Sequence, residues 1–203
     1  MHLLEAPQLY HLYQSLGGFL SARRKSLQQY VELSGVKRIF DIGCGPGHTV
    51  QYLPEGIDYI GFDTDRRYIE FATAKFGNRG KFLARHFDST AANEFGRPDL
   101  IMMNGVLHHL DDQTAIEVLT NCSAALSSGG MFYALDPCLV PGQNPIARRL
   151  ILGDRGKFVR TKEGYEALVR DAFARSEVII RDDLAFAPYT FSITRGWPPG
   201  IER

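Results

Sequence analysis

The sequence has few cysteines and no long hydrophobic run, and each shortage excludes a class of protein. Its three cysteines, Cys44, Cys122 and Cys138, are scattered through 203 residues without metal-ligand spacing, so we expect reduced thiols and no disulfide framework. No stretch reaches the length of about 18 apolar residues that a transmembrane helix needs. The N-terminus also lacks the basic and apolar regions of a signal peptide. These features predict a cytoplasmic protein without a membrane span.

An excess of charge of either sign is also missing. Lys and Arg together number 23, Asp and Glu together number 23, and the formal net charge is zero. A balanced chain offers no bulk electrostatic attraction to nucleic acid or to an anionic membrane surface. We therefore expect no nucleic-acid partner, and the composition leaves the oligomeric state open.

What the sequence does contain is a regular alternation of strand-like and helix-like segments. We predict strands at 37–42, 59–62, 81–87, 100–103, 131–135, 176–182 and 187–194. Helices are predicted within 7–34, with a break at Gly17-Gly18, and at 47–53, 65–76, 89–95, 112–126 and 161–173. Residues 138–160 read as an irregular, basic segment. This order predicts an α/β fold with a doubly wound, mostly parallel seven-stranded sheet and an antiparallel last strand.

Polar side chains stand at the predicted ends of the strands, where ligands bind in doubly wound sheets. They are Asp41, Asp63, Asp88, Asn104 and Asp136. Because the carboxyl ends of parallel strands meet at one edge of the sheet, we expect these groups to surround a single ligand site.

The most informative stretch is 38–48, RIFDIGCGPGH, with glycines at 43, 45 and 47. A loop without Cβ atoms lets a ligand approach the backbone. A dinucleotide is one candidate, because Asp63 lies at the spacing of the ribose-binding acid. However, His48 stands where the dinucleotide pattern has its third glycine, and Asp41 would repel a pyrophosphate. A ligand with cationic groups fits better, and S-adenosylmethionine carries a sulfonium and an ammonium.

The segment DIGCGPG resembles the cofactor loop of class I S-adenosylmethionine-dependent methyltransferases. IGFDTD, FDS, DLIMMNGVLHHLDD and LSSGGMFYALDP resemble the segments that follow it in that family, so the resemblance covers about 36–137. It implies a Rossmann-like methyltransferase fold and S-adenosylmethionine as cofactor, and we expect no metal site. It also implies that Asp63 holds both ribose hydroxyls and that Asp88 meets the adenine amino group. The remaining expected cofactor residues are Asp41, Gly43, Cys44, Gly45, Gly47, His48, Thr64, Asn104 and Gly105.

The resemblance further implies methyl transfer to an oxygen or nitrogen of a small molecule. The signature Asn/Asp-Pro-Pro-Tyr/Phe for the amino groups of nucleic-acid bases is absent, and the corresponding place reads NGVL. We expect one domain over 1–203, made of a helical cap (1–34), a cofactor-binding core (36–137) and an acceptor-side lid with closing strands (138–203). The alternatives are an NAD-dependent oxidoreductase of Rossmann type and a non-catalytic cofactor-binding partner subunit.

Two adjacent histidines, His108 and His109, follow the fourth strand, where the methyl acceptor lies in this family. Histidine titrates near neutral pH and can remove a proton from a hydroxyl or an ammonium. We predict His108 as the base, oriented by Asp136. The alternative is that both histidines are packing residues and that catalysis rests on positioning. The expected acceptor contacts are Tyr10, Tyr13, Gln14, His109, Arg148, Arg149, Arg155 and Tyr189.

Overall fold

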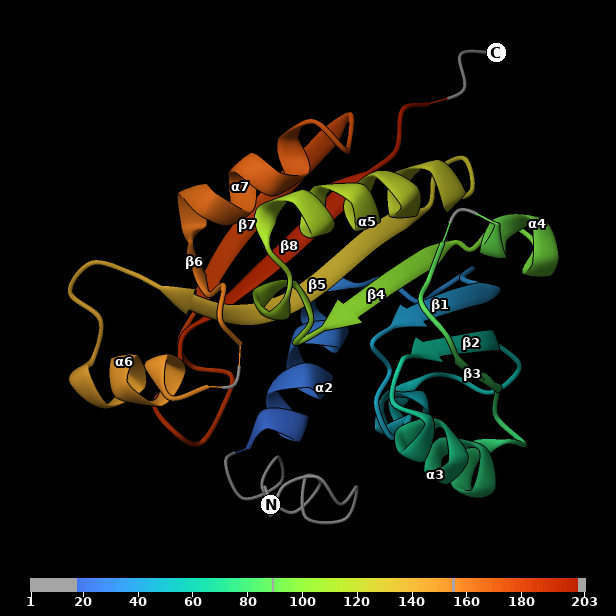
Figure 1. Ribbon diagram of the computed structural model, residues 1–203, viewed down its shortest axis with the longest axis horizontal. Coiled ribbons are helices and arrows are strands. Elements are labelled where there is room, and N and C mark those ends of the chain that lie inside the picture. The colour runs from blue at the N-terminus through green and yellow to red at the C-terminus, as the bar shows by residue number, and fades with distance from the viewer. Residues whose placement is uncertain (1–17, 89, 155, 201–203) are drawn as a thin grey trace.

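The computed structural model describes residues 18–88, 90–154 and 156–200. A twisted sheet runs through its middle, with helices on both faces (Figure 1). The strands are β1 (Arg38–Ile42), β2 (Asp58–Asp63), β3 (Lys81–Ala84), β4 (Leu100–Asn104), β5 (Met131–Leu139), β6 (Arg160–Thr161), β7 (Arg175–Arg181) and β8 (Phe191–Trp197). Seven of them follow the order β3-β2-β1-β4-β5-β8-β7, and β6 pairs with the end of β5.

The strand directions confirm the predicted fold class. Strands β1 to β5 are parallel to one another, and β8 is antiparallel to both β5 and β7. The order turns at β1, because β2 and β3 lie on one side of it and β4 and β5 on the other. This reversal is the topological switch point of a doubly wound sheet, where the strand ends leave room for a ligand.

Each face of the sheet packs against its own set of helices. These are α2 (Phe19–Tyr30), η2 (His48–Tyr52), α3 (Arg66–Phe76), α4 (Ala91–Phe95), η3 (Leu107–His109), α5 (Asp112–Ala125), α6 (Pro145–Leu152) and α7 (Lys162–Arg170). Helices α4, α5 and α7 contribute to one buried cluster, and α2, η2, α3 and α6 to the other. Successive side chains of β1 point to opposite faces of the sheet, so Ile39 packs in the second cluster and Phe40 in the first.

The prediction that 138–160 is irregular is wrong for Pro145–Leu152, which form helix α6. Asn144 caps this helix by accepting hydrogen bonds from the backbone of Ile146 and Ala147, and Pro145 occupies its first turn. Ala147 and Ile151, four residues apart, are buried on the inner side. The surrounding Arg and Gly residues obscured this short helix in the sequence.

Several predicted boundaries also differ. Strand β3 ends at Ala84 rather than 87, α7 ends at Arg170 rather than 173, and β8 covers 191–197 rather than 187–194. Strand β5 continues four residues beyond the predicted end, because β8 pairs with it through Pro137. Asp136 therefore lies inside a strand rather than after it.

Gly18 adopts φ +75° directly before α2, and residues 7–17 of the predicted helical segment lie outside the described residues. Within the part of the chain that the structure describes, no helix is both long and apolar enough to cross a membrane.

Candidate active site

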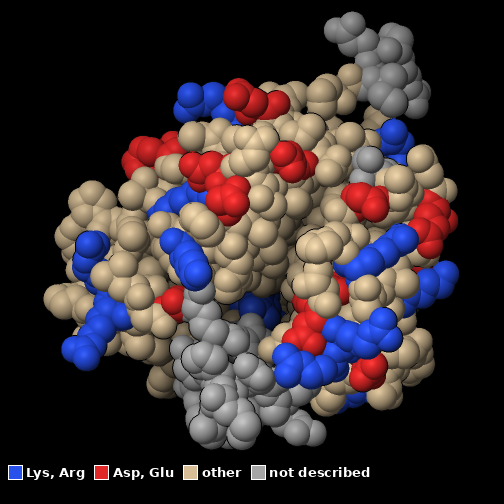
Figure 2. Space-filling view, viewed as in Figure 1, with Lys and Arg blue, Asp and Glu red and all other residues tan. Residues whose placement is uncertain are grey.

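A cavity of about 580 Å³ opens at the carboxyl ends of β1, β2 and β4. Figure 2 shows the face of the molecule on which these strands end, and this face is hollowed near its centre. Seven of the predicted cofactor residues line the cavity: Gly43, Cys44, Gly45, Asp63, Thr64, Asn104 and Gly105. Much of this wall therefore consists of residues at strand ends that the sequence pattern predicts.

The three glycines of the loop have different tasks. All have positive φ, which disfavours other residues, but only Gly45 has open space where a Cβ would stand. A Cβ on Gly43 would lie 2.4 Å from Val106, and one on Gly47 would lie 2.8 Å from the Phe82 ring. Gly43 and Gly47 therefore allow close packing of the protein on itself, whereas Gly45 leaves the backbone accessible to a ligand.

Asp63, the predicted ribose ligand, is held by backbone amides. The N–H of Gly45 donates to its Oδ2 at 2.8 Å, and the N–H of Asp65 donates to its Oδ1 at 2.8 Å. These bonds fix the carboxylate at the cavity wall. Each oxygen retains a lone pair, so the group can accept two further hydrogen bonds, as a ribose diol requires.

Asp41 does not line the cavity. Its side chain is 1% exposed, and its Oδ2 accepts a hydrogen bond from the Tyr59 hydroxyl at 2.7 Å. Burial raises its pKa to about 7, although the Tyr59 bond and the nearby Arg23 charge act in the opposite direction. Its Oδ1 is buried without a hydrogen-bond partner among the described residues. The structure thus offers a buried acceptor beneath the loop instead of the expected carboxylate on the cavity wall.

Three other predicted cofactor residues also lie off the cavity wall. Gly47 packs as described above, and His48 is buried with its ring edge-on to Phe71 and Phe76. Asp88 is exposed and accepts the Thr90 N–H at 2.8 Å, so it forms a local turn. The hydrogen bonds from Thr90 hold the pKa of the Asp88 carboxyl below its usual range.

Apart from His109, the remaining residues of the cavity wall were not predicted from the sequence. Apolar groups line one part, which suits a flat heterocycle: Phe62, Phe87, Met103, Val106, Leu110 and Val118. Arginines line another: Arg23, Arg67 and Arg85. Phe62 and Phe87 stand directly beside Asp63 and Asp88 in the sequence, so their position was a usable signal. No sequence motif indicated Arg23, because it lies on α2, upstream of the glycine loop and the motifs that follow it.

The predicted pairing of His108 with Asp136 is present. The two side chains meet at 2.7 Å between His108 Nδ1 and Asp136 Oδ1, and the His108 backbone N–H donates to the same oxygen at 3.2 Å. The other ring nitrogen, Nε2, lies 3.4 Å from Oδ1 of Asp154. Asp154 follows α6 and carried no signal in the sequence. His108 is only 5% exposed, so both ring nitrogens face carboxylates inside the protein.

These two carboxylates determine the charge of His108. Burial by itself lowers its pKa, but the hydrogen bonds and charges of Asp136 and Asp154 outweigh burial and raise it to about 9. The Asp154 carboxyl responds in the complementary way: burial raises its pKa, but the bond from His108 and others lower it to about 2. At neutral pH His108 therefore carries a proton on each nitrogen and cannot accept another while both contacts hold.

The segment around Asp154 closes over His108. We call Gly153, Asp154 and residues 156–158 the Asp154 loop. Asp154 accepts hydrogen bonds from the Gly156 N–H at 3.1 Å and the Tyr189 hydroxyl at 3.2 Å, and the Phe158 N–H donates to the His108 carbonyl at 3.0 Å. A Cβ on Gly156 would lie 1.9 Å from the His108 ring. Only glycine fits there, so the loop lies directly against the imidazole.

His109 is the histidine that lines the cavity, and its ring centroid lies 4.2 Å from that of His108. Donor atoms of His108, His109 and Asp154 lie within 4.8 Å of one another, a spacing that a metal ion would accept. A metal ion there would have to displace the proton that His108 Nε2 carries toward Asp154.

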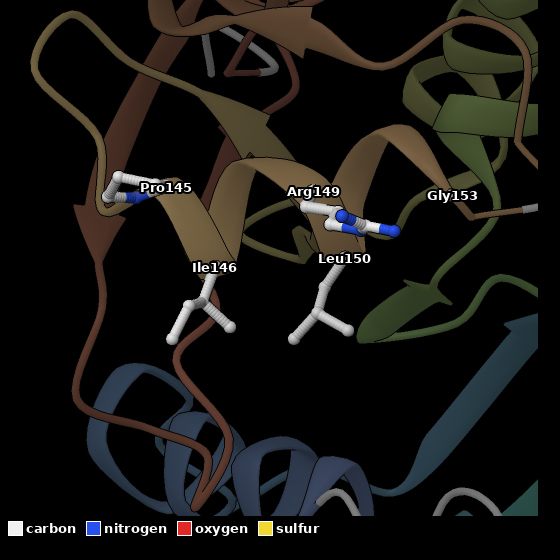
Figure 3. A pocket seen from close by; sticks show the side chains of 5 residues that line it. All are labelled: Pro145, Ile146, Arg149, Leu150 and Gly153. Carbon is white, nitrogen blue, oxygen red and sulfur yellow. The ribbon is translucent and has the colours of Figure 1, made fainter.

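The other predicted acceptor residues lie elsewhere or outside the described part. Arg148 and Arg149 are exposed on α6. Arg149 lines a shallow depression of about 430 Å³, from whose rim Ile146 and Leu150 project on the same side of the helix (Figure 3). Tyr189 is buried against Asp154. Tyr10, Tyr13, Gln14 and Arg155 lie outside the described residues.

Known proteins share the fold of this chain. Residues 40–132 match the family model described as a methyltransferase domain. The 3-hydroxy-5-methyl-1-naphthoate 3-O-methyltransferase of Streptomyces sahachiroi is 29% identical over 125 residues, which cover 58% of this chain and 36% of that protein. Human N-acetylserotonin methyltransferase in complex with SAM superposes with a TM-score of 0.67 at 16% identity, covering 95% of this chain and 54% of that one. A SAM-dependent methyltransferase from Archaeoglobus fulgidus gives a TM-score of 0.68 at 18% identity, covering 92% of this chain and 99% of that one.

At these identities the solved structures show a shared fold, and the chain spans about a third of the length of the naphthoate methyltransferase. The sheet order, with the glycine loop and Asp63 at the strand ends, is a Rossmann-like fold that the chain shares with these solved methyltransferases. In fold the chain is similar to S-adenosylmethionine-dependent methyltransferases, and the methyltransferase-domain model matches just under half of its residues.

Proposed function

We propose that this protein binds S-adenosylmethionine in the cavity of about 580 Å³ and transfers its methyl group to an oxygen or nitrogen of a small molecule. The observation that carries the proposal is the joint placement of Gly45 and Asp63. The backbone N–H of Gly45 donates a hydrogen bond to the Asp63 carboxylate at 2.8 Å, and no atom lies within 4 Å of where a Cβ on Gly45 would stand. Neither the NAD-dependent oxidoreductase nor the non-catalytic subunit receives support from the known relatives.

The residues of the cavity suit the parts of this cofactor. Asp63 can accept both ribose hydroxyls, and the apolar wall with Phe62 and Phe87 can hold the adenine ring. The amino-acid end then extends over β1 toward Asn104 and Gly105. When bound, the cofactor supplies a methyl group on a sulfonium, which is already a strong electrophile. The remaining task of the protein is to hold the acceptor in line with that methyl group.

We propose His108, oriented by Asp136, as the base for this acceptor, with one condition added by the structure. Nε2 faces Asp154 at 3.4 Å, so the Asp154 loop must move away and the proton must leave before the ring can act. His109, on the cavity wall, is proposed as an acceptor contact. The basic residues Arg148, Arg149 and Arg155 are proposed as a lid for an acidic acceptor, because guanidinium groups pair well with carboxylate and phosphate.

The relatives guide the choice of acceptor. The named activity of the Streptomyces relative is O-methylation of a hydroxynaphthoate, which is an aromatic hydroxyl on a molecule with a carboxylate. We propose the same chemical class here. We also retain the division into a cofactor core (36–137) and an acceptor-side part (138–203). The proposed cytoplasmic location rests on three buried, free cysteines.

Calorimetry with S-adenosylhomocysteine and with NAD tests the cofactor. We expect binding of S-adenosylhomocysteine and no comparable binding of NAD, and tighter binding of NAD would overturn the proposal. Transfer of a labelled methyl group to a panel of hydroxynaphthoates, phenols and amines then tests the acceptor class.

The role of His108 is tested by the pH dependence of turnover. If the ring must lose its proton, kcat should rise with pH toward about 9. His108→Gln should remove this rise and lower kcat by about 10²–10⁴-fold, the usual size of general-base help. An unchanged pH profile in His108→Gln would show that the histidine is structural and that positioning alone supports catalysis.

A further inference from the structure

The cavity wall contains three arginines, and two of them are already paired. Arg67 forms hydrogen bonds to both carboxylate oxygens of Asp65, at 3.1 and 2.8 Å. Arg85 forms a salt bridge with Glu94. Arg23 differs, because it forms no ion pair among the described residues. Its Nη2 is 3.5 Å from the Asn104 carbonyl oxygen, which is a weak contact.

Arg23 also stands at a different end of the cavity. Its guanidinium lies against the end of β4, where a Cβ on Gly105 would be 3.4 Å from Nη2. Its positive charge lies close enough to Asp41 on β1 to lower the pKa of that carboxyl. Asp63 ends β2, two strands away from β4, which corresponds to about 10 Å across the sheet. A ligand whose ribose lies at Asp63 therefore reaches Arg23 with its opposite end.

We propose that Arg23 binds the α-carboxylate of the methionine part of S-adenosylmethionine. This inference rests on the proposed function and adds the residue that recognises one end of the cofactor. The carboxylate is the only anionic group of that ligand, whereas its sulfonium and ammonium would be repelled by a guanidinium. A half-buried guanidinium that the described residues leave without a carboxylate partner is suited to form a charge-assisted, two-pronged bond with it.

The test compares two ligands that differ only in this carboxylate. Calorimetry measures the binding of S-adenosylhomocysteine and of its decarboxylated form to the wild-type protein and to Arg23→Met. The wild type should prefer S-adenosylhomocysteine by roughly 10- to 100-fold, the range for hydrogen bonds to a charged group. Arg23→Met should bind both ligands about equally, with the affinity of the wild type for the decarboxylated form.

Two further variants control for charge and folding. Arg24→Met removes the neighbouring arginine of the same helix, whose guanidinium lies 6.0 Å from the centre of the Tyr52 ring, and should keep the full preference. Arg23→Lys keeps a charge without the planar fork and should keep part of the preference. Melting curves of all variants show whether they are folded.

The outcomes separate this inference from the proposed function. If the wild type prefers S-adenosylhomocysteine and Arg23→Met retains the full preference, the role of Arg23 is refuted while the cofactor assignment stands. If Arg23→Met weakens both ligands by the same factor, Arg23 only shapes the cavity and the inference is overturned. If the wild type binds neither ligand, the proposed function fails and this inference fails with it.

Discussion

The two halves of the ligand-binding edge are built from different parts of the polypeptide. Around β1 and β2 the wall is largely main chain, with open space above Gly45 and backbone amides holding Asp63. Around β5 and η3 the edge is closed by side chains, with His108 between Asp136 and Asp154. The first half leaves a cavity, and the second fills the equivalent space. The first half therefore has room for a ligand, whereas in the second half the space is taken by His108 and its two carboxylate partners.

Two buried carboxylates make the contrast quantitative. Asp41 and Asp136 lie in strands on either side of β4, and each is 1% exposed. Asp41 has a neutral donor, the Tyr59 hydroxyl, and burial raises its pKa to about 7. Asp136 faces an imidazole whose own pKa is raised to about 9. The two acids are thus equally buried but have different partners, a neutral hydroxyl for Asp41 and an imidazole with a raised pKa for Asp136.

The largest expected effect on stability comes from removing the carboxylate that pairs with His108. Asp136→Asn leaves His108 without its nearest carboxylate, and removing one partner of a buried pair costs about 3–5 kcal/mol. Urea unfolding at pH 7 should show this loss. Asp41→Asn is the matched control, since Tyr59 can donate equally well to an amide oxygen. A greater loss in Asp41→Asn than in Asp136→Asn would contradict the comparison.

The second prediction is a pH dependence of stability. The folded pKa of His108 is raised, so the stability it contributes is complete below about 6.5 and is lost as pH rises through about 9. The shift corresponds to about 3 kcal/mol at 1.36 kcal/mol per unit. The difference in unfolding free energy between wild type and His108→Gln should therefore shrink from pH 6 to pH 10. A constant difference would mean that His108 is uncharged in the folded protein.

The third prediction tests the open half. Asp63→Ala removes two charge-assisted hydrogen bonds to the ribose, so binding of S-adenosylhomocysteine should weaken by roughly 30-fold or more. Asp88→Ala serves as control, because Asp88 lies in a turn beside the cavity rather than on its wall. Calorimetry on both variants should show a loss in the first only. Equal losses would move the adenine site toward Asp88.

The smallest effect distinguishes the glycines of the loop. At φ +54° an alanine at position 45 costs about 1 kcal/mol of stability, since no neighbour lies within 4 Å. Gly47→Ala should cost more, because its Cβ would meet Phe82 at 2.8 Å. Cofactor affinity should fall mainly in Gly45→Ala, where the added methyl group faces the ligand. Thermal melting and calorimetry on the two variants separate packing from binding.

Much of the fold was predictable because its signals are local. The alternation of apolar strands with amphipathic helices gave the sheet and its class, and polar residues after strands pointed to one edge. The pairing of His108 with Asp136 followed from the same reasoning, since β4 and β5 are neighbours. Asp88, expected at the end of a strand, lies in a turn because β3 already ends at Ala84.

The sequence by itself determined what depends on a residue and its near neighbours: the glycine torsions, the strand-end acids and the apolar alternation. Tertiary structure decided which distant side chains share a space. Arg23 reaches the cavity because α2 packs against β4 and β5, through Asn104 and Tyr133. Asp154 reaches His108 because α6 and the Asp154 loop pack on that edge. The charge of His108 and the burial of Asp41 follow from those contacts, because pKa values depend on the surrounding charges and on exclusion of water, which no local pattern encodes.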